Sequence, residues 1–225
     1  MLRDLREHGE LSTVKDTYNA IAGTSVERLA ALSDGVFAVA MTLLVLDIRV
    51  PAVEAIHTEM DLWLAIGALS PRLMMYVMSF MTLGIFWVGQ QTQLNHLARS
   101  TRSLTWIHLA FLFAVSMTPF STTLLAQFTA YRSAMLIYWL NILTLGATLY
   151  YSWVCALGSG VVEADMPKAA SEAIKRRILI AQALYAFGAL LCAYNTYWSI
   201  GFIVLVQLNY AVAPHLPRRI RREQD

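Results

Sequence analysis

The residue best placed for chemistry in this sequence is a carboxylate inside an apolar segment. Asp34 lies within a mostly apolar run, Leu29–Ile48, which has the length of about 20 residues that a membrane-spanning helix needs. An ionisable group at such a position is costly unless it is paired or hydrated. Arg28 is the nearest cation, but its spacing from Asp34 is not that of an intrahelical pair. We therefore expect Asp34 either to form a structural ion pair with a neighbouring helix or to contact a permeating species.

A stripe of mostly apolar side chains follows Asp34 on one face of the same segment. Val39, Thr42 or Leu43, and Leu46 recur every three or four residues, so they share one face of a helix. On periodicity alone, this stripe favours helix packing over the lining of a pore.

Other polar residues are sparse and lack the spacing of known catalytic or metal centres. Gln90, Gln91 and His96 lie just beyond a second apolar run, and His108 lies in the first turns of a third. The two histidines are not at metal-ligand spacing with any carboxylate or cysteine. The Walker A, CxxC, HExxH and GxSxG patterns do not occur, and neither does the TVGYG carbonyl filter of ordinary potassium channels. We expect no enzyme activity, no cofactor and no metal centre.

Composition indicates that the elements holding these residues lie in a membrane. The 225 residues are 57% apolar and 14% charged, whereas soluble domains have roughly 45–50% apolar and about 25% charged residues. The net charge of +2 and the low charged fraction argue against a nucleic-acid binder. Cys155 and Cys192 both lie in apolar runs and do not suggest a disulfide framework.

Six stretches are long and apolar enough to span a bilayer, so we predict an all-α membrane protein with six transmembrane helices. The segment Met60–Leu69 is too short and is followed by Pro71, and we predict that it forms an interfacial helix. The sequence Thr24-Ser25-Val26-Glu27 fits a capping box at the start of the first helix. The predicted spans are Leu29–Ile48, Leu73–Val88, Leu104–Leu125, Ala134–Leu157, Ile178–Tyr194 and Tyr197–Ala213.

Lysine and arginine are distributed unevenly over alternate loops. One side collects 14 of the 17 Lys and Arg residues, and such a bias marks the cytoplasmic side. With six spans, both termini are predicted to be cytoplasmic. The chain then divides into a cytoplasmic N-terminal tail (1–24), a six-helix transmembrane domain (25–214) and a basic cytoplasmic C-terminal tail (215–225). The other side holds only Arg49, Arg72 and Arg132.

The first span also carries a family resemblance. Its segment Arg28–Ala38, RLAALSDGVFA, resembles the R-x-x-x-F-S-D-G-V-F-A signature of the transmembrane protein 175 potassium-channel family. The similarity covers about residues 25–125, with further matching positions at Tyr76, Phe86-Trp87 and Pro119-Phe120. Elsewhere it rests on hydropathy alone.

Four residues depart from the family's pattern. Leu32 replaces the usual aromatic residue, Gln90-Gln91 stand where many members have a histidine pair, and His108 stands where many have asparagine.

The resemblance implies a prokaryotic-type subunit, four of which surround one pore lined by the first helix. Carried over by position, Val39, Thr42, Leu43 and Leu46 form an apolar constriction, which reverses the reading from periodicity. An apolar ring cannot replace the hydration shell of an ion and can gate by dewetting, so the weakly hydrated potassium ion should pass more readily than sodium. The expected function is a potassium-selective leak channel in the plasma membrane. Its expected partners are potassium ions, the lipid bilayer and three further copies of the chain; no nucleic acid and no other metal are expected.

The resemblance also assigns a polar network at the cytoplasmic mouth. Arg28, Ser33 and Asp34 would tie the first helix to the second and third. Gln90, Gln91 and His108 would be their partners.

The alternative is a proton-coupled secondary transporter in which Asp34 carries the proton. Such carriers have Gly- or Pro-broken helices in both halves. Pro119 interrupts the third predicted span, and no matching break is found in the second half of the sequence.

Overall fold

The computed structural model describes residues 25–212, and only the backbone of Ala211 and Val212. The predicted tails, and Thr24 of the expected capping box, lie outside these residues. The described residues form no strand and are mostly helical. The α-helices are α2 (Val26–Leu43), α3 (Glu59–Ala68), α4 (Ser70–Leu94), α5 (Arg102–Gln127), α6 (Arg132–Gly158), α7 (Lys168–Leu190) and α8 (Thr196–Val212), with 3-10 turns at η1 (Leu44–Asp47), η2 (Val53–Ala55) and η3 (Leu191–Ala193).

Five of the described helices are long and apolar enough to cross a membrane. They are Val26–Asp47, Ser70–Leu94, Arg102–Gln127, Arg132–Gly158 and Lys168–Ala193, and they correspond to the first five predicted spans. The sixth predicted span corresponds to α8, of which 17 residues are described. A sixth crossing therefore stays a prediction.

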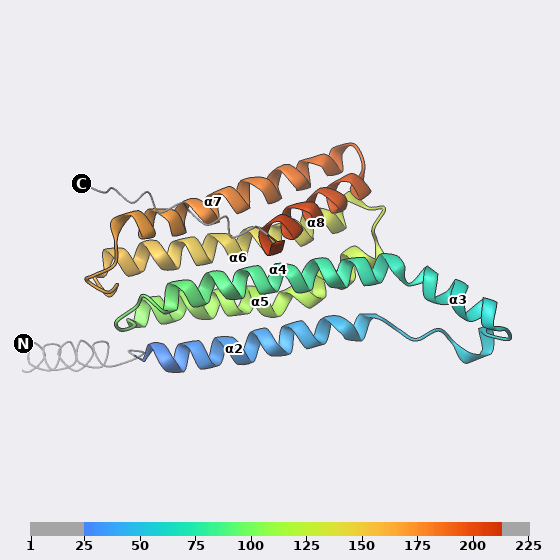
Figure 1. Ribbon diagram of the computed structural model, residues 1–225, viewed down its shortest axis with the longest axis horizontal. Coiled ribbons are helices and arrows are strands. Elements are labelled where there is room, and N and C mark those ends of the chain that lie inside the picture. Colours follow the sequence, from blue (N-terminus) through green and yellow to red (C-terminus); the bar gives the residue numbers. More distant parts are fainter. Residues whose placement is uncertain (1–24, 213–225) are drawn as a thin grey trace, which may run out of the picture.

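The long helices form one bundle in which successive helices alternate in direction, so α2, α5 and α7 run one way and α4 and α6 run the other (Figure 1). The core is formed by α4, α5 and α6, with α5 packed along both of the others. At one edge α2 contacts α4 and α5, and at the opposite edge α7 contacts α6 and α8. The short helix α3 projects past the end of the bundle (Figure 1), in the segment for which an interfacial helix was predicted.

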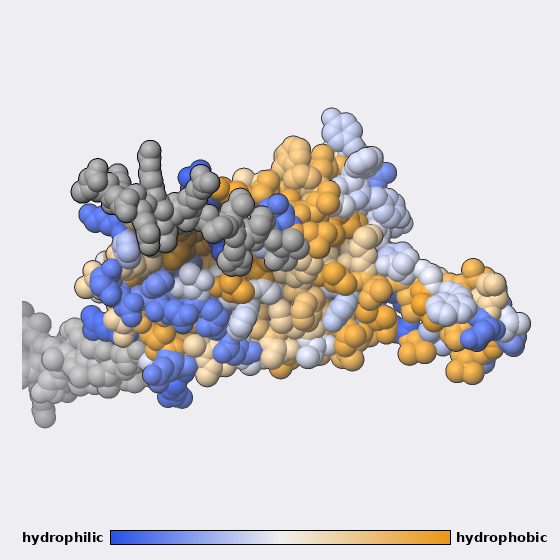
Figure 2. All heavy atoms as spheres, in the orientation of Figure 1, coloured by the Kyte–Doolittle hydropathy of each residue, from blue (hydrophilic) through white to orange (hydrophobic). Residues whose placement is uncertain are grey.

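One end of the bundle is strongly hydrophilic. Here α2, α5 and α7 begin, and α4 and α6 end. Figure 2 shows hydrophilic side chains at this end and a mostly hydrophobic band along the middle. The uneven distribution of Lys and Arg along the sequence assigns 14 of them to one side of the membrane. Those among them that the structure describes all belong to these helix ends and loops. We call this the hydrophilic end; that it faces the cytoplasm remains a prediction.

Side-chain caps fix the beginnings of two helices. The Ser25 hydroxyl accepts a hydrogen bond from the Arg28 amide at 3.2 Å, so Ser25 is the cap of α2. At α3, Thr58 and Asp61 form a capping box. The hydrogen bonds from Thr58 and His57 hold the pKa of the Asp61 carboxyl below its ordinary value.

Buried hydroxyl and amide groups join four helices at the centre of the bundle. The Tyr138 hydroxyl of α6 lies 3.3 Å from Ser79 Oγ, which donates to it, and 3.2 Å from Thr82 Oγ1. From α5, Thr122 donates to Ser79 Oγ at 2.7 Å, and from α8, Gln207 donates to Thr82 Oγ1 at 2.6 Å. Polar groups in an apolar interior are stable only when they are paired, so these bonds fix how the four helices pack.

Two glycines give a direct test of the packing of α7 against α8. A Cβ on Gly188 would lie 2.9 Å from Ile203 Cγ1, whereas one on Gly201 would meet nothing within 4 Å. Gly188→Ala should lower the free energy of unfolding by about 1–3 kcal/mol because it overpacks the contact. Gly201→Ala should leave it unchanged or raise it by up to about 1 kcal/mol, because alanine favours a helix. Unfolding in detergent, followed by circular dichroism, measures both; equal losses would contradict this packing.

Candidate functional site

The helix α2 divides into a buried face and an exposed face. Its buried face carries Leu29, Ser33, Phe37 and Ala40, continued by Leu44 of η1, and packs on α4 and α5. These residues recur every three or four positions, as one face of a helix requires.

The predicted constriction residues all lie on the exposed face. Val39 is 58% exposed, Leu43 45% and Leu46 70%, and Thr42 is also exposed. The Thr42 hydroxyl lies 2.9 Å from both the Ala38 and the Val39 carbonyl oxygens, to which it can donate. Its oxygen lone pairs therefore remain available on this face.

A groove of about 480 Å³ runs along this exposed face. Leu32, Gly35, Val39 and Leu43 line it from α2, and Ser116 lines it from α5. A Cβ on Gly35 would meet nothing within 4 Å. The chain's own described residues therefore leave this face unfilled.

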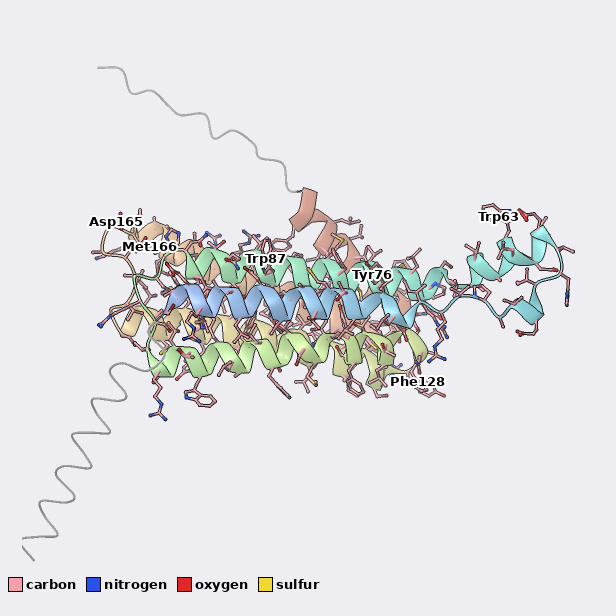
Figure 3. The ribbon with its side chains drawn as sticks, turned by 90° about the horizontal axis from the view of Figure 1, so that it is seen from below. Trp63, Tyr76, Trp87, Phe128, Asp165 and Met166 are labelled. Carbon is pink, nitrogen blue, oxygen red and sulfur yellow. The ribbon has the colours of Figure 1, made fainter. Side chains whose placement is uncertain are left out.

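Asp34 is held by two donors from α4. Its Oδ1 accepts hydrogen bonds from Trp87 Nε1 at 2.8 Å and from Gln91 Nε2 at 2.7 Å. Figure 3 shows Trp87 on α4, beside α2. No donor among the described residues reaches Oδ2, and the side chain is exposed. Among the described residues, the carboxylate is thus only half satisfied.

Ser33 and Gln90, which directly precede Asp34 and Gln91 in the sequence, make a second, buried contact. Gln90 Nε2 donates to Ser33 Oγ at 2.9 Å, and Ser33 Oγ donates to the Leu29 carbonyl at 2.8 Å. Consecutive residues of α2 therefore bind consecutive residues of α4. We call Ser33, Asp34, Trp87, Gln90 and Gln91 the α2–α4 clamp.

The two remaining residues of the predicted network lie apart from the clamp. His108 is buried between α5 and α6, with Nδ1 at 3.1 Å from the Leu104 carbonyl oxygen and at 3.5 Å from Ser152 Oγ. Arg28 is exposed, and it forms no ion pair with Asp34. Asp34 instead uses neutral donors, of which Trp87 was not predicted.

The site offers no arrangement for bond-making chemistry. Within residues 25–212, no three His, Cys, Asp or Glu side chains gather so as to hold a metal ion. The site consists of a polar clamp between two helices and an open, mostly apolar groove beside it. The clamp can hold α2 in position against α4, and the groove offers a surface along which a solute can pass.

Comparison with known proteins identifies related channels. Residues 28–119 match the family model described as "Endosomal/lysosomal potassium channel TMEM175". A potassium channel of Streptomyces collinus is 42% identical over 101 residues, which are 45% of this chain and 48% of that protein. The endosomal/lysosomal proton channel TMEM175 of Mus musculus is 33% identical over 93 residues, 39% of this chain and 19% of that one. The matched segment thus spans about half the length of the bacterial relative. These relatives are ion channels rather than enzymes.

A solved structure extends the similarity over most of the chain. It is the crystal structure of a lysosomal potassium-selective channel TMEM175 homolog from Chamaesiphon minutus, with a TM-score of 0.73 and 26% sequence identity. The match covers 84% of this chain and 97% of that one.

The indole donor of the clamp can be tested against another tryptophan. Trp87→Phe removes the hydrogen bond from the indole N–H to Asp34. It should lower the free energy of unfolding by about 1.5 kcal/mol, which is the lower end of the range for hydrogen bonds to charged groups. Trp106 on α5 is 62% exposed and has no hydrogen-bond partner among the described residues, so Trp106→Phe should change it much less. Thermal unfolding in detergent compares the two, and equal shifts would show that the indole N–H contributes nothing.

Proposed function

Since this chain belongs to the TMEM175 family, we propose that it is a potassium-selective leak channel whose pore is lined by α2. It is a multi-pass membrane protein, and we assign it to the plasma membrane. The Streptomyces relative is named a potassium channel and the Chamaesiphon structure a potassium-selective channel homolog. We propose the same potassium channel activity for this chain.

The half-satisfied carboxylate of Asp34 is the observation that carries the proposal. A charged group facing lipid at this depth would cost several kcal/mol, of the order of 3 kcal/mol on insertion scales. Its unpaired Oδ2 on the exposed side of α2 therefore needs water or a second subunit. Since α2 lies at the edge of the bundle, further copies of the chain can enclose this face as a pore.

The apolar stripe would form the narrow part of that pore. Val39, Leu43 and Leu46 extend over about 10 Å of helix axis at 1.5 Å per residue. Apolar rings of this kind do not replace the hydration shell of an ion, and they gate by dewetting. Four copies of Thr42 would add one ring of hydroxyl oxygens between the apolar layers.

The remaining assignments complete the proposed subunit. We assign α8 as the sixth span, with the tail 1–24, the transmembrane domain 25–214 and the tail 215–225 as the divisions of the chain. Both termini are then cytoplasmic, at the hydrophilic end, where the basic residues favour the cytoplasm. Four identical subunits would close the pore.

The alternative function is a proton-coupled carrier that uses Asp34. The name of the mouse relative, a proton channel, makes proton movement worth testing. Carriers of this kind have broken helices in both halves. By contrast, α5 is one helix through Pro119, and α6 is one helix over Arg132–Gly158. The described helices therefore favour the channel.

Removal of one apolar layer tests the pore. Leu46→Ala should widen the constriction and raise potassium flux into liposomes at least about fivefold, which corresponds to about 1 kcal/mol off the barrier. Leu190 on α7 is equally exposed at 70% but lies at the opposite edge of the bundle, so Leu190→Ala is the matched control. If both variants conduct like the unmodified protein, Leu46 of η1 does not form part of the constriction.

Neutralisation of Asp34 separates the channel from the carrier. Asp34→Asn keeps the Oδ1 acceptor but loses the charge, so the clamp should weaken by about 1 kcal/mol while passive potassium flux persists in the folded protein. A carrier would lose proton-driven uptake altogether, with the same weakening of the clamp. Flux in reconstituted liposomes distinguishes the two, and thermal unfolding of the same preparations measures the clamp.

A further inference from the structure

A second cavity lies on the side of the bundle away from α2. It has a volume of about 200 Å³ and lies between α4, α6, α7 and α8. Most of its lining is apolar. The apolar walls include Ile85, Phe86, Leu149, Ile174, Ile178 and Ala181.

The cavity is a slot that leads from the surface into the bundle. Phe86 and Tyr185 at one end are buried, whereas Thr92, Ala173 and Arg177 at the other are exposed. Along α7, the lining from Ala173 to Tyr185 extends over about 18 Å of helix axis. The slot therefore runs parallel to the helices, with its open part toward the hydrophilic end. These are the dimensions and direction of a lipid chain in a bilayer leaflet.

The mouth of the slot carries positive charge without a counter-ion among the described residues. Arg177 lines the mouth, and its guanidinium lies 5.7 Å from the centre of the Tyr210 ring. In contrast to Lys175, whose Nζ pairs with Glu172 at 2.6 Å, Arg177 and the exposed Arg176 have no acidic partner among the described residues. Arg177 directly precedes the apolar run that begins at Ile178, so its depth is that of lipid headgroups.

We propose that this slot binds an anionic phospholipid. The acyl chain would lie along Phe86, Ile178 and Tyr185, and the phosphate would bind Arg177, since a guanidinium matches the geometry of a phosphate. Basic pockets between transmembrane helices are known sites for anionic headgroups. The chain's own segment 213–225 is a poor alternative occupant, because it contains four Arg against one Glu and one Asp and would be repelled by Arg177.

Lipid retention tests the headgroup contact. The full chain is reconstituted in phosphatidylcholine vesicles with an equal amount of phosphatidylglycerol, extracted in mild detergent and examined by native mass spectrometry. The unmodified protein should retain phosphatidylglycerol in preference to phosphatidylcholine. Arg177→Gln should lower that preference about fivefold, the value of one basic residue near an anionic surface. Arg176→Gln, the matched control beside the slot, should lower it much less.

A bulky side chain at the mouth tests the slot itself. Ala173→Phe should abolish the retention, whereas Ala183→Phe, also exposed on α7 but outside the lining, should not. Unchanged preference in both Arg177→Gln and Ala173→Phe would overturn the proposal. The proposal would also be overturned if only a chain lacking residues 213–225 bound the lipid, because the tail would then be the occupant. Displacement of the lipid by inorganic phosphate would overturn it as well. Since the readout is lipid rather than flux, failure of the channel proposal would leave this result unaffected.

Discussion

A carboxylate inside a membrane helix must be satisfied, and this need organises the contact of α2 with the rest of the bundle. Asp34 takes two donors from α4, and the adjacent Ser33 takes a third through Gln90. These bonds fix both the register of α2 against α4 and its rotation, because a turn of the helix would break all of them at once. That rotation leaves Val39 and Leu46 on the exposed face.

The core of the subunit uses a different kind of polar contact. Ser79, Thr82 and Tyr138 are fully buried, and each has a hydrogen-bond partner on a neighbouring helix. Small hydroxyl residues allow helices to approach closely and hydrogen-bond across their interface. The described contacts at the centre of the bundle therefore join neutral groups, whereas the half-satisfied carboxylate of Asp34 lies at the edge of the bundle, on α2.

The sequence predicted the spans well because length and hydropathy are local properties. It placed the end of the second span at Val88, whereas α4 continues to Leu94. The polar residues beyond Val88 ended the apolar run, but Gln90 pairs with α2 and Gln93 donates to the Leu149 carbonyl of α6. Such partners are tertiary and have no signature in hydropathy.

The polar site was predictable only in part. The sequence proposed Gln90 and Gln91 as partners, and both contact α2, but it also proposed His108, which faces α6 instead. Trp87 was overlooked as a donor although it lies four residues before Gln91 and so shares its face of α4. An indole N–H in a membrane span needs an acceptor, which was the available signal. The predicted capping box of Thr24 and Glu27 was wrong, because Ser25 is the cap of α2 and accepts from the Arg28 amide.

The amide side chains of Gln90 and Gln91 give the clamp a property that histidines would not. Histidine gains or loses a proton near neutral pH and thereby exchanges a donor for an acceptor. An amide keeps the same two donors and one carbonyl oxygen at every physiological pH. The α4 side of the contact thus remains chemically constant through acidification, and a compartment's pH cannot loosen α2 by titrating these two residues.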